Sequence, residues 1–456
     1  MLLAVVALVA GACTGSGDGA RPTGPPSREP QGVRHVVVDT DLAFEDVFAL
    51  LYLLQRDDVA IDAVTIAGTG EAHCDPGVSN ALGILALGGE TDVPVACGRE
   101  TPLRGSNAFP QEWRDAADDL SMANLPATDG EPDPRGAPEL LIDTLDDDAT
   151  LITLGPLTNV AEALRADPGL PNRVPRTISM AGAIDVGGNA PGGAAEFNVW
   201  ADPLAAKEVV EGMDVTLVPL DATNDVPYTS FFSETLKANL DTPEARAVDA
   251  IISANEEIFA DSSFWDTLAT TLTFRPELAT WGRAKVLVTD SLDAGAGWID
   301  RWDDGVPVRF ANAVPDPLAF EREFLSVIAG RTITRVRPAP TMTIAFDGER
   351  CSVRPDEVRL GRQVVAFEGG GPKSGAVLVE LSDAFTYDDL RAFLGPDGSP
   401  PPEGRPPADI EVLAFAGPDL AEAETTGPPV VGVCFLQQRS GRPVGAWLSR
   451  PVRVSD

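Results

Sequence analysis

The chain passes from an apolar run into a cluster of acids in His35-Val36-Val37-Val38-Asp39-Thr40-Asp41-Leu42-Ala43-Phe44-Glu45-Asp46. The apolar run is typical of a buried parallel strand, and residues 46–54 continue as a helix. The acids therefore lie at the carboxyl end of a strand, the edge of an open α/β sheet where ligands bind. Because carboxylates so close together repel one another, the stretch predicts a hard cation, Ca²⁺ or Mg²⁺, beside them. A solvated acidic turn that caps the helix is the alternative interpretation.

Strand-like and helix-like segments alternate from residue 33 to about residue 290. This alternation predicts a mostly parallel, open α/β sheet with a Rossmann-like core. The strand candidates are 35–39, 61–67, 150–154, 177–181, 215–220 and 284–289, and the helical stretches include 78–88, 157–166 and 202–211. The composition changes after 332–340, and the short alternating runs beyond this linker predict a small β-sandwich. We therefore expect an N-terminal segment over 1–32, an α/β domain over 33–335 and a β-rich domain over 341–456.

The N-terminal segment is apolar, too short to span a membrane as a stable helix, and ends in small residues before Cys13. It predicts an export signal, and the small residues before a cysteine resemble the lipobox of bacterial lipoproteins, in which that cysteine becomes lipidated. Residues 14–31, rich in Gly, Pro and Ser, predict a flexible tether. We therefore expect a protein anchored by lipid at the outer face of the bacterial cell membrane.

The remaining four cysteines can be oxidised if the chain is exported. Cys74 and Cys97 lie in the expected α/β domain, and Cys351 and Cys434 lie in the expected β-rich domain. One pairing within each domain accounts for all four, with buried free thiols as the alternative. The two histidines have no zinc-like spacing to each other or to a cysteine pair.

The chain is strongly acidic, with 70 Asp and Glu against 34 Lys and Arg and a formal net charge of −36. Such a field repels nucleic acid and anionic lipid, so the expected partner is a neutral small molecule or a cation. The alternative is that the charge only maintains solubility. Assembly into a homo-oligomer stays open.

Three later segments place polar residues at a strand end or a helix start. They are Leu154-Gly155-Pro156-Leu157-Thr158-Asn159, the stretch from Asn189 through Glu196-Phe197-Asn198 to Asp202, and Trp265-Asp266-Thr267. Each alone has an ordinary structural explanation, such as a helix start, an Asx-rich loop or an N-cap. With the opening acids, their order and spacing resemble the nucleoside hydrolase family, the inosine–uridine-preferring ribohydrolases, over about residues 33–330.

The resemblance implies a calcium ion that holds the ribose and the attacking water. By motif, the metal ligands would be Asp41, Asp46, the Leu154 carbonyl and Asp266, and the substrate contacts would be Glu45, Asn189, Glu196, Asn198 and Asp266. The resemblance also makes Asp41 the general base, because a carboxylate beside metal-activated water can accept its proton. The implied reaction is hydrolysis of a ribonucleoside to free base and ribose.

Three departures from the family pattern bear on specificity. Glu45 replaces the first of two adjacent Asp residues, and Thr69 follows Gly68 where the family usually has Asn. Trp265 stands where many members have a His that protonates the leaving base. An aromatic side chain there favours purine nucleosides by stacking, whereas core packing is the alternative for Trp265.

Three other functions compete with this interpretation. The Asp39-Thr40-Asp41 order resembles the haloacid-dehalogenase phosphatases, but Ala43 stands where Thr or Val is needed. An EF-hand loop requires Gly at the sixth position, where the chain has Phe44. A non-catalytic lipoprotein that binds nucleosides or sugars is the remaining alternative.

Overall fold

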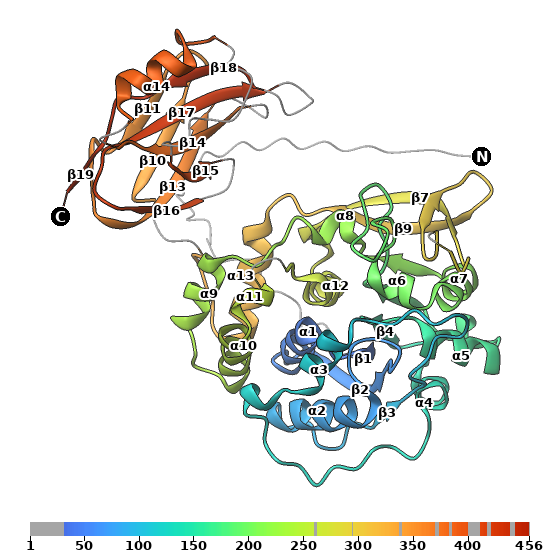
Figure 1. Ribbon diagram of the computed structural model, residues 1–456. Coiled ribbons are helices and arrows are strands. Elements are labelled where there is room, and N and C mark those ends of the chain that lie inside the picture. Colours follow the sequence, from blue (N-terminus) through green and yellow to red (C-terminus); the bar gives the residue numbers. More distant parts are fainter. Residues whose placement is uncertain are drawn as a thin grey trace, which may run out of the picture. The chain divides into compact units, whose positions relative to one another are not determined.

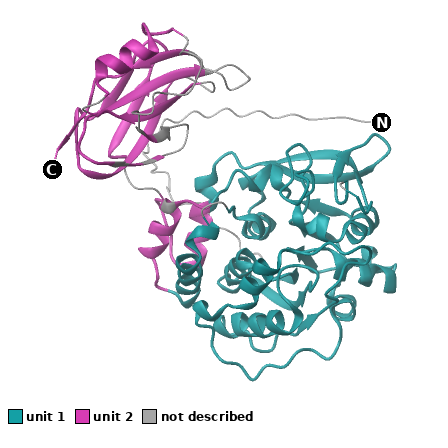
Figure 2. Ribbon diagram, in the orientation of Figure 1, with its two compact units in different colours: residues 1–227, 242–320 teal, residues 228–241, 321–456 magenta. Residues whose placement is uncertain are grey.

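The computed structural model describes residues 32–259, 262–293, 295–336, 340–369, 374–382, 385–399, 411–416, 421–437 and 443–455. The chain divides into two compact units, residues 1–227 with 242–320 and residues 228–241 with 321–456 (Figure 2). The expected export signal and tether, up to residue 31, lie outside the described residues, as does the middle of the expected linker, 337–339. The expected boundaries at 335 and 341 remain predictions.

A nine-stranded sheet organises the first unit, with the strand order β3-β2-β1-β4-β5-β6-β9-β7-β8 (Figure 1). Its strands are β1 (Arg34–Thr40), β2 (Val59–Ile66), β3 (Val95–Cys97), β4 (Ala149–Thr153), β5 (Arg176–Ser179), β6 (Val215–Leu217), β7 (Thr280–Val288), β8 (Ile299–Arg301) and β9 (Val306–Ala313). The strands from β3 to β9 in this order pair in parallel, and β7 is antiparallel to both β9 and β8. The predicted mostly parallel α/β sheet is therefore confirmed.

Helices cover the sheet of the first unit (Figure 1). They are α1 (Phe44–Leu54), α2 (Cys74–Leu87), α3 (Gln111–Asp118), α4 (Ala137–Thr144), α5 (Thr158–Ala166), α6 (Phe197–Ala201), α7 (Pro203–Gly212), α8 (Leu220–Thr223), α10 (Pro243–Ala254), α11 (Glu256–Phe259) and α12 (Trp265–Phe274), with single turns at Ser121–Ala123, Leu170–Asn172 and Pro276–Leu278. Leu140 of α4, Val160 of α5 and Val209 of α7 share one buried core with Val37 and Leu151 of the sheet. Burial of these apolar faces is the main stabilising contribution in the unit.

The second unit contains α9 (Ser230–Lys237), most of α13 (Pro317–Ile328) and a β-sandwich. The two sandwich sheets have the orders β11-β10-β13-β16 and β15-β14-β17-β18. Their elements are β10 (Met342–Phe346), β11 (Cys351–Arg354), β13 (Gly361–Gly369), β14 (Ser374–Glu380), β15 (Glu411–Ala416), β16 (Ala421–Thr425), β17 (Val430–Gln437) and β18 (Pro443–Leu448), beside the short pair β12 (Glu357–Arg359) and β19 (Arg453–Ser455) and the helix α14 (Tyr387–Leu394). The prediction of a β-sandwich is confirmed.

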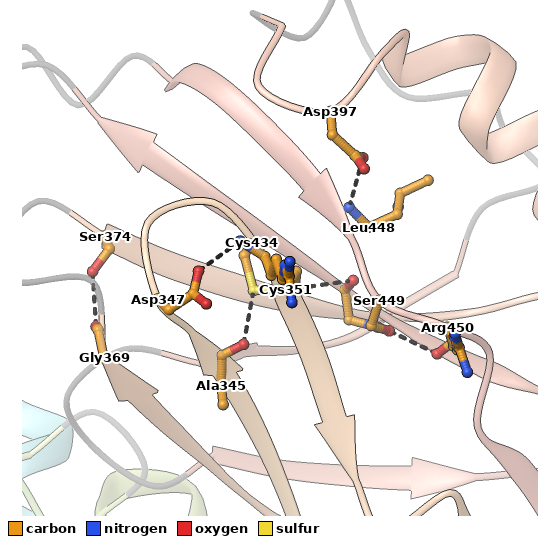
Figure 3. Close-up of a disulfide and its surroundings, with 12 residues drawn as sticks. Ala345, Asp347, Cys351, Gly369, Ser374, Asp397, Cys434, Leu448, Ser449 and Arg450 are labelled. Carbon is orange, nitrogen blue, oxygen red and sulfur yellow. Dashed lines mark hydrogen bonds between the residues drawn. A yellow bond between two sulfur atoms is a disulfide. The ribbon is translucent and has the colours of Figure 1, made fainter.

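Both predicted disulfides are present. Cys74–Cys97 ties the start of α2 to the end of β3 in the first unit. Cys351–Cys434 joins β11 of one sandwich sheet to β17 of the other (Figure 3). Both residues of this second bridge are buried in the core between the sheets.

None of the described helices combines the length and the hydrophobicity needed to cross a membrane.

Candidate active site

A cavity of about 660 Å³ lies among the loops that follow the sheet strands in the first unit. The nine residues predicted for the site all line it: Asp41, Glu45, Asp46, Leu154, Asn189, Glu196, Asn198, Trp265 and Asp266. They come from chain segments up to 225 residues apart, from Asp41 to Asp266. The fold therefore brings the four sequence motifs to one place.

Asp41 occupies a slot between two glycines. A Cβ atom at Gly70 would lie 2.1 Å from Asp41 Oδ2, and one at Gly155 would lie 2.8 Å from Asp41 Cβ. The backbone N–H of Glu71 donates to Asp41 Oδ2 at 3.0 Å. The loops after β2 and β4 thus fix the carboxylate from two sides, and only glycine leaves room for it at both positions.

Asp46 fixes the start of α1. Its Oδ2 accepts from the Ala43 backbone N–H at 3.1 Å, and its Oδ1 accepts from the Thr40 hydroxyl. The turn between β1 and α1 includes Leu42 at a φ of 57°, a left-handed conformation that is unfavourable for a branched side chain. The burial of Leu42 within the core offsets this strain.

Leu154 and Asn198 meet in the lining of the cavity. The Asn198 amide donates to the Leu154 carbonyl at 2.7 Å and to the Met180 carbonyl at 3.2 Å. The amide N–H groups of Asn198 are therefore occupied by backbone acceptors. A carbonyl oxygen has two lone pairs, so Leu154 keeps one for a further partner.

Glu196 is the N-cap of α6. Its carboxylate accepts from the backbone N–H groups of Asn198 at 2.7 Å, Gly182 at 3.1 Å and Val199 at 3.2 Å. Asn189 accepts from the Phe197 N–H at 3.1 Å, so its own amide N–H groups are not used in that bond. These contacts hold the loop between β5 and α6 against the cavity.

Burial dominates the electrostatics of the site. Asp41, Asp46 and Asp266 are 3%, 0% and 4% exposed. Burial raises the pKa of Asp46 to about 6. Burial and then repulsion by Asp46 raise the pKa values of Asp41 and Asp266 well above the usual range. Burial and then repulsion by Glu71 do the same for the pKa of Glu45.

These carboxylates provide the kind of ligands that a hard cation requires. No three His, Cys, Asp or Glu side chains in the described part of the chain are already grouped to hold a metal ion. The donors are nevertheless all oxygens, and Asp266 Oδ1 is buried without a hydrogen-bond partner among the described residues. A buried carboxylate oxygen without a hydrogen-bond partner, surrounded by carboxyl groups whose pKa values are raised, is unfavourable until a cation or a proton neutralises it. The residues therefore fit a divalent cation by chemistry.

The inosine–uridine preferring nucleoside hydrolase family model matches residues 36–321. The chain belongs to this family. The match covers the sheet and the cavity and leaves out the β-sandwich.

The relatives of the chain carry several substrate names. The probable uridine nucleosidase 2 of Arabidopsis thaliana is 31% identical over 43% of this chain and 62% of its own length. A pyrimidine-specific ribonucleoside hydrolase of an Enterobacter strain is 31% identical over 48% of this chain and 69% of its own length. The chain thus spans less than two thirds of the Arabidopsis protein.

Solved structures agree with the fold. The nucleoside hydrolase of Bacillus anthracis has a TM-score of 0.58 and 25% identity over 65% of this chain and 99% of its own. The purine-preferring ribonucleoside hydrolase of Gardnerella vaginalis has a TM-score of 0.57 and 22% identity over 65% of this chain and 98% of its own, which supports the fold alone.

The sequence interpretation missed Glu71 as a site residue. The departure at Thr69 drew attention to its loop, but Thr69 bonds to the Thr158 hydroxyl at 2.9 Å and does not line the cavity. Glu71 lines the cavity instead. Burial and repulsion by Asp46 raise its pKa to about 8, against the lowering effect of Arg114. Its place just beyond the carboxyl end of β2 was the available signal.

Trp265 lines the cavity at the start of α12. It is half-buried, and its indole Nε1 has no hydrogen-bond partner among the described residues. Four further aromatic residues line the cavity, and two of them, Phe109 and Trp113, lie outside the motifs that the sequence singled out. These two belong to the segment between β3 and α4, which carries no clear sequence periodicity.

We expect Gly70→Ala to lower the free energy of unfolding by roughly 1–3 kcal/mol, because the new methyl group overlaps Asp41. Urea unfolding measures this change. The matched control is Gly136→Ala, where the nearest atom to the added Cβ would be 3.8 Å away and little change is expected. Equal stability of the two variants would contradict the slot described for Asp41.

We expect the thermal midpoint of the chelator-treated protein to fall between about pH 5 and about pH 8. Asp39 is buried and accepts from Thr65 at 2.6 Å and Asn159 at 2.8 Å, and burial raises its pKa to about 7. A raised pKa means that the folded state binds the proton more tightly, so this stabilisation is present at acid pH and is lost as the pH rises through the folded pKa.

Asp39→Asn should flatten that fall, because the amide mimics the protonated acid. Calorimetric melting of wild type and variant at matched pH values makes the comparison. A thermal midpoint that rises across the same interval in the wild-type protein, or an unchanged slope in the variant, would exclude a buried, readily protonated Asp39.

Proposed function

We propose that the protein hydrolyses the N-glycosidic bond of ribonucleosides to free base and ribose. The observation that carries the proposal is Asp41, held between Gly70 and Gly155 in a cavity that also contains Asp46 and Asp266. Membership of the nucleoside hydrolase family supports the same reaction.

Calcium is the cation we propose for the site, held by the carboxylates of Asp41, Asp46 and Asp266 and the Leu154 carbonyl. All four residues line the cavity, and their oxygens suit calcium better than a softer metal. When bound, calcium would lower the pKa of the attacking water and neutralise the carboxylates around it.

Asp41 accepts the proton of the attacking water in this mechanism. Its hydrogen bond from the Glu71 N–H and the two glycines keep one oxygen in a defined direction. A carboxylate in that position acts as a general base once the water is acidified. The bond from C1′ to the base breaks as positive charge develops on the ribose, and the carboxylates of Glu45 and Glu196 in the cavity lining stabilise that charge.

We propose that Glu45, Asn189, Glu196 and Asn198 bind the sugar hydroxyls. Asn189 has amide N–H groups free of its bond to Phe197, and Asn198 has a free carbonyl oxygen beside its two donated bonds. Buried polar groups that pair with sugar hydroxyls discriminate against sugars that lack them. Ribose is the expected sugar.

The base preference has two candidates. Trp265 and the aromatic lining of the cavity favour a purine, which offers a larger surface for stacking. The names of the Arabidopsis and Enterobacter relatives favour a pyrimidine. We propose purine nucleosides as the better substrates because the stacking groups belong to this chain.

Release of ribose from inosine, with calcium and after chelation, tests the proposed reaction. We expect activity that chelation abolishes and added calcium restores. Asp41→Asn should lower kcat roughly 10²–10⁴-fold, because the general base is lost. Asp92→Asn, an exposed substitution outside the cavity, is the control. Full activity in chelator or in Asp41→Asn would exclude the mechanism, and nucleoside binding without hydrolysis would favour the non-catalytic lipoprotein.

The ratio of kcat/KM for inosine to that for uridine measures the base preference. Trp265→Ala should lower the ratio if stacking supports purines. A preference for uridine in the wild-type protein that persists in Trp265→Ala would favour the pyrimidine candidate. Equal rates for inosine and 2′-deoxyinosine would exclude recognition of the 2′-hydroxyl by Glu45.

We also propose export and lipid anchoring through Cys13, outside the described residues. Two disulfides support an oxidising compartment. Mass spectrometry of the native protein should detect a lipidated Cys13 at the N-terminus, and an unprocessed Met1 would exclude it.

A further inference from the structure

The cavity is lined by acids without any balancing base. Its described lining includes eight carboxylate residues, Asp41, Glu45, Asp46, Glu71, Glu112, Glu196, Glu257 and Asp266, and no Lys, Arg or His. The proposed calcium site and sugar contacts use five of these acids, Glu196 included. A neutral nucleoside does not need the rest. The remaining acids therefore require another explanation.

Three acids of the lining remain unused, and two of them have side chains that are accessible to a ligand. Glu112 on α3 and Glu257 on α11 are exposed on the wall of the cavity. Neither side chain has a hydrogen bond or an ion pair to another described residue. Their charges are therefore available to a molecule that enters the cavity.

Aromatic rings line the same cavity. The Phe197 ring lies 5.0 Å from the Phe109 ring and 5.0 Å from the Trp113 ring, measured between centroids. Trp113 is 40% exposed and directly follows Glu112 in α3. We call Phe109, Glu112, Trp113, Phe197 and Glu257 the acidic aromatic wall. Aromatic faces next to carboxylates form the surface that attracts a flat organic cation.

We propose that the site prefers ribonucleosides whose base carries a positive charge, such as N-ribosylpyridinium compounds and 7-alkylpurine nucleosides. The inference rests on the proposed hydrolysis and adds the charge of the base to it. The acidic aromatic wall contacts the cationic base, while the carboxylates of the proposed calcium site and sugar contacts hold the calcium ion and the sugar.

The chemistry of such substrates suits the cavity. The electron pair of the C1′–N bond passes to the ring nitrogen, cancels its positive charge and releases a neutral base. The water oxygen forms the new bond to C1′, and its proton goes to Asp41. No proton has to reach the leaving base. Trp265 at the position of the usual family acid is therefore no obstacle.

Nicotinamide riboside and inosine are the cationic and neutral probes. The measured quantity is the ratio of their kcat/KM values, in calcium, for the full chain. In Glu112→Gln/Glu257→Gln the ratio should fall by about fivefold to tenfold, as expected for the loss of two exposed charges near a cation. The matched control is Glu90→Gln/Glu211→Gln, which removes two exposed acids outside the cavity and should leave the ratio unchanged.

A neutral isostere separates charge from shape. The carbon-linked benzamide riboside has the same outline as nicotinamide riboside without its charge, and it should bind more weakly to the wild-type protein. Titration calorimetry compares the affinities for the two ligands and decides the inference even if no nucleoside is hydrolysed. Absence of hydrolysis would exclude the proposed function but not the charge preference. Equal affinity for the two ligands, or equal changes of the ratio in the two double variants, would overturn the charge preference.

Discussion

The burial of several carboxylates close together is the constraint on which this site depends. Asp41, Asp46 and Asp266 are almost without solvent, and after burial itself, repulsion by Asp46 raises the energy of ionising both Asp41 and Asp266. Such an arrangement persists only when the backbone around it is fixed by other contacts. Gly70 and Gly155 do this for Asp41 by steric exclusion, and the cap of α1 does it for Asp46.

A second layer of polar contacts holds the loops that carry the carboxylates. Buried Arg114 donates to the Gly70 carbonyl at 2.6 Å, to the Gly68 carbonyl at 3.1 Å and to His73 at 3.2 Å. His73 in turn contacts Asp118 at 2.7 Å. This chain of contacts runs from α3 to the loop after β2, so the same helix both supports the Asp41 slot and presents Trp113 to the cavity.

The departures from the family pattern change the character of the cavity rather than closing it. Thr69 turns to Thr158 and leaves the lining, while Glu71 two residues later enters it. Trp265 adds an aromatic face where a titratable side chain is usual in the family. Glu71 contributes negative charge to the cavity and Trp265 contributes aromatic surface, and the two properties act together on a flat cation.

The sequence by itself determined the elements whose signals are local. The apolar run of β1, the acids after it and the start of α1 are adjacent in the chain, so strand periodicity and helix capping are enough to predict them. The positions of the cysteines predicted which ones would pair if oxidised, and the structure decided between these bridges and free thiols. Tertiary structure alone decided that Glu71, Phe109 and Trp113 would join the cavity, and that β9 would pair with β6. These contacts join segments far apart in sequence, and they depend on loop closures and long-range packing that local periodicity does not encode.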